Sequence, residues 1–223
     1  MRAKRLLRRG LLLTVEGPEG SGKSTQIPYL ATALRKAGYA VVQSREPGGT
    51  PVAEAIRKVL LLSPSQERIT AETEALLIFA ARSQHVVHVI RPALERGAIV
   101  LCDRFSDSTL AYQGFARGLN LKWLRAADAI ATGGLNPDLT LLLDLPVVVG
   151  LARRRTARGK QNRLDHESER FHRLVRRGFL TLAKQSAGRI TIIKANRPME
   201  DVRADLEAFV LRWVFTHRRG GES

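Results

Sequence analysis

The stretch Gly17–Ser24, GPEGSGKS, matches the phosphate-binding loop pattern G-x-x-x-x-G-K-[ST] at every fixed position. The apolar run 11–15 before the loop predicts a strand, and residues 25–36 after it have helical periodicity. In that context the backbone N–H groups of the loop point inward at a phosphate, and the helix adds its positive N-terminal end. The stretch therefore predicts a nucleoside triphosphate site, although it does not say which reaction follows.

The loop pattern also assigns roles to single residues. We expect Lys23 to reach the β- and γ-phosphates and the Ser24 hydroxyl to bind Mg²⁺. The residues expected to bind ATP are Gly17, Pro18, Glu19, Gly20, Ser21, Gly22, Lys23, Ser24 and Thr25.

Short apolar runs alternate with helical segments along the whole chain of 223 residues, which is typical of a parallel α/β sheet. The predicted strands are 11–16, 40–44, 98–102, 139–144 and 190–194. The predicted helices are 22–36, 52–62, 71–96, 121–132, 146–155, 167–186 and 199–215. Within helix 71–96, Pro92 should kink or break the last turn. We expect a three-layer P-loop NTPase fold, with a five-stranded parallel sheet and helices on both faces.

The domain prediction is a single kinase domain over residues 1–223. It includes a basic tail at 1–10, an arginine-rich lid at 153–165 and a C-terminal tail at 216–223, with disorder expected for both tails. No apolar stretch approaches the roughly 20 residues that span a membrane. The apolar start of the chain is interrupted by arginines and runs into the first strand, so we read no signal peptide and expect a cytoplasmic protein.

Ligands of such sheets lie beyond the carboxyl ends of the strands, so the residues there are candidates for chemistry. Asp103 and Asp144 each close an apolar strand and could help to hold Mg²⁺. Asp103 is favoured because Arg104 follows it and places a guanidinium at the same strand end. Asp144 could equally cap the helix that begins near Pro146.

Other charged and aromatic residues suit a second substrate. Arg45, at a strand end, and Arg57, on a helix, could bind its phosphate, although Arg57 could also be solvated surface. Phe79 and Arg82 lie one helical turn apart and could stack on a base and hydrogen-bond its edge. The alternative from spacing alone is that Phe79 is core and Arg82 is surface.

The segment Ala152–Arg163 is rich in arginine, whereas the phosphate-binding loop contains none. It is interpreted as a lid that closes over phosphates and supplies positive charge, or alternatively as a solvated basic loop. The formal net charge of +16 also suggests nucleic acid as a partner. Because the arginines spread over most helices, a basic surface with a phosphate-gathering site explains the charge, and no nucleic-acid partner is expected.

Four stretches make the chain resemble the bacterial thymidylate (dTMP) kinase family over nearly its whole length. They are VEGPEGSGKS at 15–24, with an acidic residue in the third loop position, REPGGT at 45–50, DRF with STLAYQG at 103–105 and 108–114, and NPDLT at 136–140. The resemblance implies transfer of a phosphoryl group from ATP to dTMP, with Mg²⁺, and a homodimer formed through helix 71–96 and its neighbours.

The resemblance also implies residue roles. Glu19 would lie near the acceptor sugar, Arg104 would bridge the phosphates of donor and acceptor, and Arg158 would act from the lid. Together with Lys23 and Asp103 these are the expected catalytic residues. Tyr112 would disfavour a 2′-hydroxyl. The remaining substrate contacts would come from Arg45, Arg57, Ser108, Gln113, Phe79 stacked on thymine and Arg82 at its O4.

Two departures from the family pattern are visible. The family often spaces the phenylalanine and arginine four apart, whereas Phe79 and Arg82 are three apart and Ile78 occupies the other position. The lid ends in QNRLD at 161–165, where relatives often have Asp-Arg-x-Glu. Two rival functions stay open: another pyrimidine nucleoside monophosphate kinase, and a nucleic-acid-stimulated P-loop ATPase.

Overall fold

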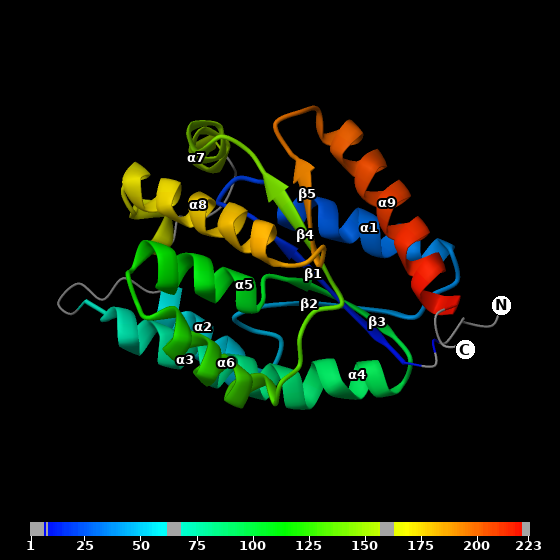
Figure 1. Cartoon of the computed structure of the whole chain (residues 1–223), viewed down its shortest axis with the longest axis horizontal. Coiled ribbons are helices and arrows are strands. Elements are labelled where there is room, and N and C mark those ends of the chain that lie inside the picture. Colours follow the sequence, from blue (N-terminus) through cyan, green and yellow to red (C-terminus); the bar gives the residue numbers. More distant parts are fainter. Residues whose placement is uncertain (1–6, 8, 62–67, 157–162, 220–223) are drawn as a thin grey trace.

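The computed structural model describes residues 7, 9–61, 68–156 and 163–219. In this part of the chain one five-stranded sheet has the order β2-β3-β1-β4-β5, and every neighbouring pair is parallel. The strands are β1 (Leu11–Glu16), β2 (Val41–Arg45), β3 (Ile99–Asp103), β4 (Leu139–Asp144) and β5 (Ile190–Lys194). The predicted five-stranded parallel sheet is therefore confirmed, and the loop-bearing strand β1 lies at its centre (Figure 1).

Helical segments connect the strands. They are α1 (Lys23–Lys36), α2 (Pro51–Leu61), α3 (Ala71–His85), η1 (Val86–Ile90), α4 (Arg91–Glu95), α5 (Ser106–Thr109), η2 (Leu110–Ala116), α6 (Leu121–Thr132), α7 (Val147–Thr156), η3 (Arg163–His166), α8 (Glu169–Gln185) and α9 (Met199–Arg219). Two of these, η1 and η2, are π-helical turns, and η3 is a 3₁₀ turn. The α5–η2 segment was not predicted as a helix.

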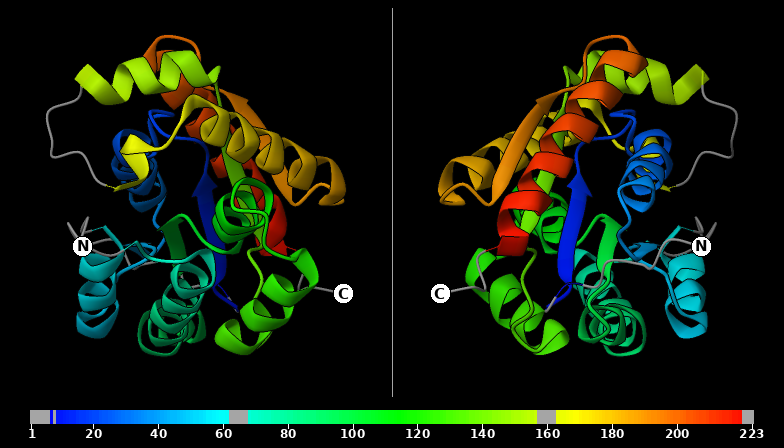
Figure 2. Two further views of the ribbon diagram at one scale, coloured as in Figure 1. Left: turned by 90° about the vertical axis from the view of Figure 1, so that its left-hand side faces the viewer. Right: turned by 90° about the vertical axis from the view of Figure 1, so that its right-hand side faces the viewer.

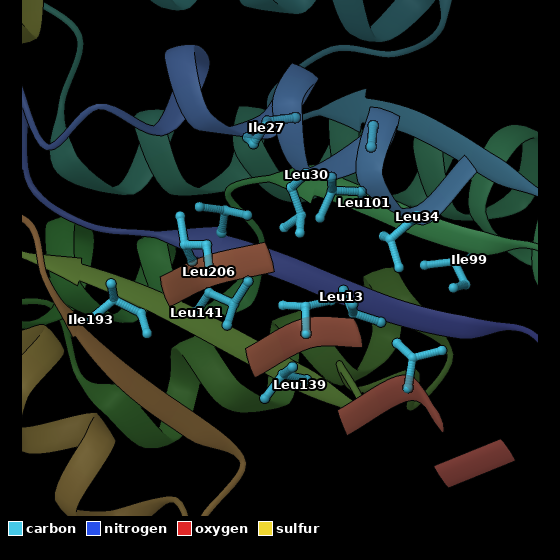
Figure 3. Packing of buried hydrophobic residues seen from close by; sticks show 14 of the residues in the cluster. Leu13, Ile27, Leu30, Leu34, Ile99, Leu101, Leu139, Leu141, Ile193 and Leu206 are labelled. Atoms are coloured by element: carbon cyan, nitrogen blue, oxygen red, sulfur yellow. The ribbon is translucent and has the colours of Figure 1, made fainter. Parts of the chain in front are cut away.

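Alternate residues of the strands face opposite layers of the molecule, as period-two geometry requires. Leu13, Leu101 and Leu141 belong to the cluster that packs against α1 and α9. In Figure 3 the α1 side chains Leu30 and Leu34 extend toward this face of the sheet. This packing buries one face of α1 against the sheet. Because α1 follows the phosphate-binding loop directly, it holds the loop against the end of β1.

The opposite face of the sheet is covered by helices from the middle of the chain. Leu12 and Val100 pack with η1 and α4, and Leu142 packs with α8 and η2. Further out, α2, α3 and α6 lie side by side in both views of Figure 2. The result is three layers, helix–sheet–helix, as expected.

The predicted helix 71–96 is interrupted earlier than expected. A π-helical turn, η1, separates α3 from α4, and Arg91 N–H donates to the carbonyl of Val86, five residues back. Pro92 then lies in the first turn of α4, where its missing N–H costs little. The wide turn before it avoids the clash that a proline ring causes with the preceding helical turn.

Parts of both predicted tails need correction, whereas residues 1–6, 8 and 220–223 lie outside the described residues. Helix α9 continues to Arg219, so residues 216–219 are helical. At the other end Leu7 is buried in the core and its N–H donates to the carbonyl of Gly97 at 3.1 Å. No helix in the described part of the chain is long and apolar enough to cross a membrane.

Candidate active site

The phosphate-binding loop adopts a conformation that its glycines permit. Gly17, Gly20 and Gly22 have φ values of 147°, 70° and 92°, a range that other residues rarely adopt. A Cβ atom on Gly20 would lie 2.0 Å from the carbonyl oxygen of Gly150 in α7. The close approach sets α7 directly against the loop.

Lys23 begins α1 and is buried beneath the loop. Its Nζ donates to the carbonyls of Gly17 at 2.9 Å and Pro18 at 3.1 Å, and to the Ser21 hydroxyl at 3.2 Å. Burial, with the nearby Arg104 charge, lowers the pKa of Lys23 to about 8, although neighbouring carboxylates oppose the shift. The ammonium group is therefore positioned at the loop before any phosphate binds.

A cavity of about 860 Å³ opens beside the loop. The described residues of its wall include one lysine and six arginines but only two carboxylates, Glu19 and Asp103. Its basic residues are Lys23, Arg45, Arg57, Arg104, Arg153, Arg154 and Arg197. An excess of guanidinium groups around a glycine-rich loop suits a polyphosphate.

Arg104 lines this cavity and also contacts the phosphate-binding loop and Tyr112. It has a positive φ of 68°, unusual for a residue with a side chain, which directs it back across the loop. Its guanidinium donates to Glu19 Oε1 at 2.9 Å, the Gly17 carbonyl at 3.2 Å and the Ser108 hydroxyl at 3.1 Å. It also lies over the ring of Tyr112, 5.0 Å from the centroid.

Glu19 is ionised in this environment. Burial disfavours its charge, but Arg104, Lys23 and the Tyr112 hydroxyl, which donates to Oε1 at 3.0 Å, outweigh burial and lower its pKa to about 2. The structure therefore brings together the predicted residues Glu19, Lys23, Arg104 and Tyr112.

Glu16, at the end of β1, was not predicted as a site residue. Its carboxylate accepts from the backbone N–H groups of Phe105 at 2.7 Å and Ser108 at 3.3 Å, and from the Ser108 hydroxyl at 2.6 Å. Burial and the nearby charge of Asp107 raise its pKa to about 7. A charged residue that ends a mainly apolar strand, directly before the phosphate-binding loop, was the sequence signal that could have identified it.

A second, narrow cavity of about 70 Å³ lies beside the first and is lined mainly by apolar groups. Its wall includes Ile78 of α3, Phe105 and, from η3, Leu164. The predicted residues on its wall are Arg82, Arg104, Ser108, Tyr112 and Gln113.

Phe79 does not line this cavity, contrary to the prediction that it stacks on a base. It is 6% exposed and packs edge-on against Trp123 of α6, with ring centroids 6.3 Å apart. The rotation of α3 places the neighbouring Ile78 at the cavity instead. Ile78 and Phe105 therefore form the apolar wall that Phe79 was expected to provide.

Arg82 is not a surface residue, since its side chain is only 1% exposed. Its Nε donates to Glu46 Oε2 at 2.7 Å, and its two terminal nitrogens donate to Asp128 Oδ1 at 2.7 Å and Thr109 Oγ1 at 2.9 Å. Glu46 also contacts His85 Nδ1 at 2.9 Å. Sequence reasoning identified Arg82 but not these partners, because they lie far away along the chain.

Arg45 and Arg57 both reach the large cavity. Arg45 Nη2 contacts both carboxylate oxygens of Glu54 at 3.0 Å, and Arg57 donates to the Pro47 carbonyl at 2.9 Å. Burial and the proximity of Arg45 lower the pKa of Arg57.

The two aspartate candidates for Mg²⁺ have different surroundings. Asp103 lines the large cavity together with Ser24, and its buried Oδ1 has no hydrogen-bond partner in the described structure. Asp144 instead binds Arg176 of α8 through both oxygens, at 2.7 and 2.9 Å. An unpartnered carboxylate oxygen and a serine residue on the wall of the same cavity fit a magnesium shell.

The lid falls partly outside the described residues, and Arg158 lies in that part. On its described N-terminal side, Arg153 donates to the Ala195 carbonyl at 3.1 Å, which ties α7 to the loop before α9. Arg163, on the C-terminal side, donates to the Leu60 carbonyl at 3.2 Å.

Comparisons with known proteins agree on one family. The thymidylate kinase family model matches residues 15–206. A thymidylate kinase of Pseudomonas putida (strain GB-1) is 52% identical over 201 residues, covering 90% of this chain and 95% of the relative. The corresponding protein of Pseudomonas savastanoi pv. phaseolicola is 50% identical over 211 residues, covering 95% of this chain and 99% of the relative.

Proposed function

The chain belongs to the thymidylate kinase family, and we propose that its site transfers the γ-phosphoryl group of ATP to dTMP, giving ADP and dTDP. Arg104 carries this proposal, because it lines both the large cationic cavity and the narrow apolar one. A triphosphate in the first cavity and a nucleoside in the second would therefore bring their phosphates together at one guanidinium. The rival pyrimidine kinase and nucleic-acid-stimulated ATPase are not favoured by the family relationship.

Phosphoryl transfer spreads negative charge over the moving group, so catalysis depends on position and charge rather than on a covalent intermediate. In our proposal Lys23 and Arg104 stabilise that charge from the loop and the end of β3, and Arg158 adds a guanidinium from the lid. A closed lid would also exclude water, which could otherwise accept the phosphoryl group.

The acceptor nucleotide is proposed to lie with its base against Ile78 and Phe105. Its phosphate would then approach Arg45, Arg57 and Arg104, which face the large cavity. The Tyr112–Glu19 hydrogen bond of 3.0 Å lies where we expect the deoxyribose, and a tyrosine there leaves little room for a 2′-hydroxyl.

We propose Mg²⁺ as the cofactor, held by Ser24, by Asp103 and by the phosphates of ATP. The ion would neutralise charge on those phosphates. No cluster of three or more metal-ligating His, Cys, Asp or Glu side chains occurs among the described residues, which agrees with an ion that arrives with its nucleotide.

A cytoplasmic homodimer is part of the proposal. Apolar side chains are exposed on the adjacent helices α2, α3 and α6, where Val59 is 51%, Leu76 56% and Ile130 84% exposed. A second copy of the chain would cover them, and light scattering of the purified protein measures that state directly.

The deciding experiment is a coupled ADP-release assay with ATP, Mg²⁺ and each nucleoside monophosphate in turn. We expect dTMP to give the highest kcat/KM. A preference for UMP or CMP would favour the rival pyrimidine kinase. ATP hydrolysis that DNA or RNA stimulates without any monophosphate would refute the kinase assignment.

A further inference from the structure

Glu74 of α3 is a buried carboxylate outside the catalytic machinery described above, with a side chain 2% exposed. Its Oε1 accepts from Gln113 Nε2 at 2.5 Å. Its Oε2 accepts from Arg163 and lies 3.4 Å from Arg117 Nη2. One oxygen therefore faces an amide and the other faces two guanidinium groups.

This arrangement determines which end of the Gln113 amide points to Glu74. An amide has a donor end and an acceptor end, whereas an ionised carboxylate can only accept. The NH₂ group of Gln113 must therefore face Glu74, and the amide oxygen is left for the narrow cavity that Gln113 lines. No group among the described residues donates to that oxygen.

We propose that Glu74 is a positioning residue that makes the narrow cavity select bases with an N3–H donor. Thymine and uracil carry that donor, whereas cytosine has an acceptor at N3, which would oppose the Gln113 oxygen. The inference rests on the proposed function, since it assumes that a pyrimidine base enters this cavity.

The two arginines determine in which direction a Glu74 variant should change the preference between bases. In a Glu74→Gln variant, Arg163 still requires an acceptor at this position, and Arg117, which also donates to Glu167 at 2.5 Å, still faces the same oxygen. The new amide would therefore turn its oxygen to these guanidinium groups. Its NH₂ group would then face Gln113, which must turn its own oxygen inward to accept. Gln113 would consequently present NH₂ to the base, the arrangement that suits cytosine.

The experiment measures kcat/KM for dTMP and dCMP on the full-length enzyme, with Mg²⁺ and saturating ATP. We expect the dTMP/dCMP ratio to fall about tenfold or more in Glu74→Gln, the cost of an unmatched buried hydrogen bond. Glu72→Gln is the matched control, since Glu72 is exposed on the same helix, and its ratio should equal that of the wild type. The swapped double variant E74Q/Q113E, which again presents a carboxylate oxygen to the base, should restore the preference.

A ratio in Glu74→Gln within twofold of the wild type would overturn the proposal, as would equal losses for both substrates. If Glu74→Gln does not fold, Glu74→Asp and Glu74→Asn form a second pair of matched size. The aspartate should retain a higher ratio than the asparagine, and equal ratios would overturn the proposal. A wild-type enzyme that phosphorylates no monophosphate would instead refute the proposed function itself.

Discussion

Arg104 Nη2 and Glu19 Oε1 lie 2.9 Å apart, and this ion pair joins the end of β3 to the phosphate-binding loop. Both side chains are less than one-fifth exposed, so water screens the pair only weakly. Because the same guanidinium lines both cavities, the pair holds Arg104 at their junction before substrates bind.

Replacement of Arg104 by lysine should lower kcat by about 100-fold or more, since an ammonium cannot bind Glu19, Gly17 and Ser108 in the planar geometry of a guanidinium. Steady-state kinetics with ATP and dTMP measure the effect. Arg35→Lys, an exposed arginine of α1, should leave kcat unchanged. A kcat for Arg104→Lys within threefold of the wild type would remove Arg104 from the transfer step.

Lys23→Ala should abolish measurable turnover while the protein still folds. The substitution removes the positive charge that we propose to lie beside the transferred phosphoryl group, whereas the loop conformation depends mainly on glycines. Turnover measurements check the loss of activity, and far-UV circular dichroism checks that the variant still folds. Lys36→Ala, at the exposed end of the same helix, is the control, and near-normal kcat in Lys23→Ala would contradict the site assignment.

Ile78 and Phe79 should respond oppositely to truncation. Ile78→Ala should raise KM for dTMP severalfold with a modest loss of stability, because Ile78 faces the narrow cavity. Phe79→Ala should cost about 3 kcal/mol of unfolding free energy, because its ring is buried against Trp123. Urea unfolding and substrate titration distinguish them. The opposite pattern would return the stacking role to Phe79.

Arg82→Met should destabilise the fold by about 3 to 5 kcal/mol, since it leaves the carboxylates of Glu46 and Asp128 without their shared cation. Arg173→Met removes an exposed ion pair with Glu169 and should cost no more than about 0.5 kcal/mol. Equal losses in denaturant unfolding would show that the Arg82 network contributes no more than a surface pair.

Glu16 makes stability depend on pH. Its folded-state pKa of about 7 exceeds the ordinary value of 4.5, so the native state binds more protons than the unfolded state between those pH values. Stability due to this group is therefore present at low pH and declines as pH rises toward 7. Each pKa unit corresponds to about 1.4 kcal/mol, so the decline should be on the order of 3 kcal/mol.

The Glu16→Gln variant tests this pH dependence, because it keeps an acceptor for the Phe105 N–H group but does not ionise. Relative to the wild type, its unfolding free energy should increase between pH 5 and pH 8. A difference that stays constant with pH would show that Glu16 is not protonated in the folded protein.

The features that could be predicted from the sequence are local ones. The phosphate-binding loop is a contiguous pattern, and the five strands are apolar runs between helical segments, so their existence needs no knowledge of distant residues. Asp103 and Arg104 followed from one general rule, that ligands gather beyond the carboxyl ends of parallel strands. Glu19, Lys23 and Ser24 could be predicted to lie close together because all three belong to the contiguous loop pattern.

The tertiary structure decided what depends on helix rotation and on contacts distant in sequence. Spacing could not tell whether Ile78 or Phe79 faces the narrow cavity, because the packing of α3 against α6 sets the rotation of the helix. Arg82 reaches partners 36 and 46 residues away, and no local pattern specifies such pairs. Burial of Glu16 and Glu74 likewise arises only when separate elements assemble, since desolvation is a property of the packed molecule and not of any segment.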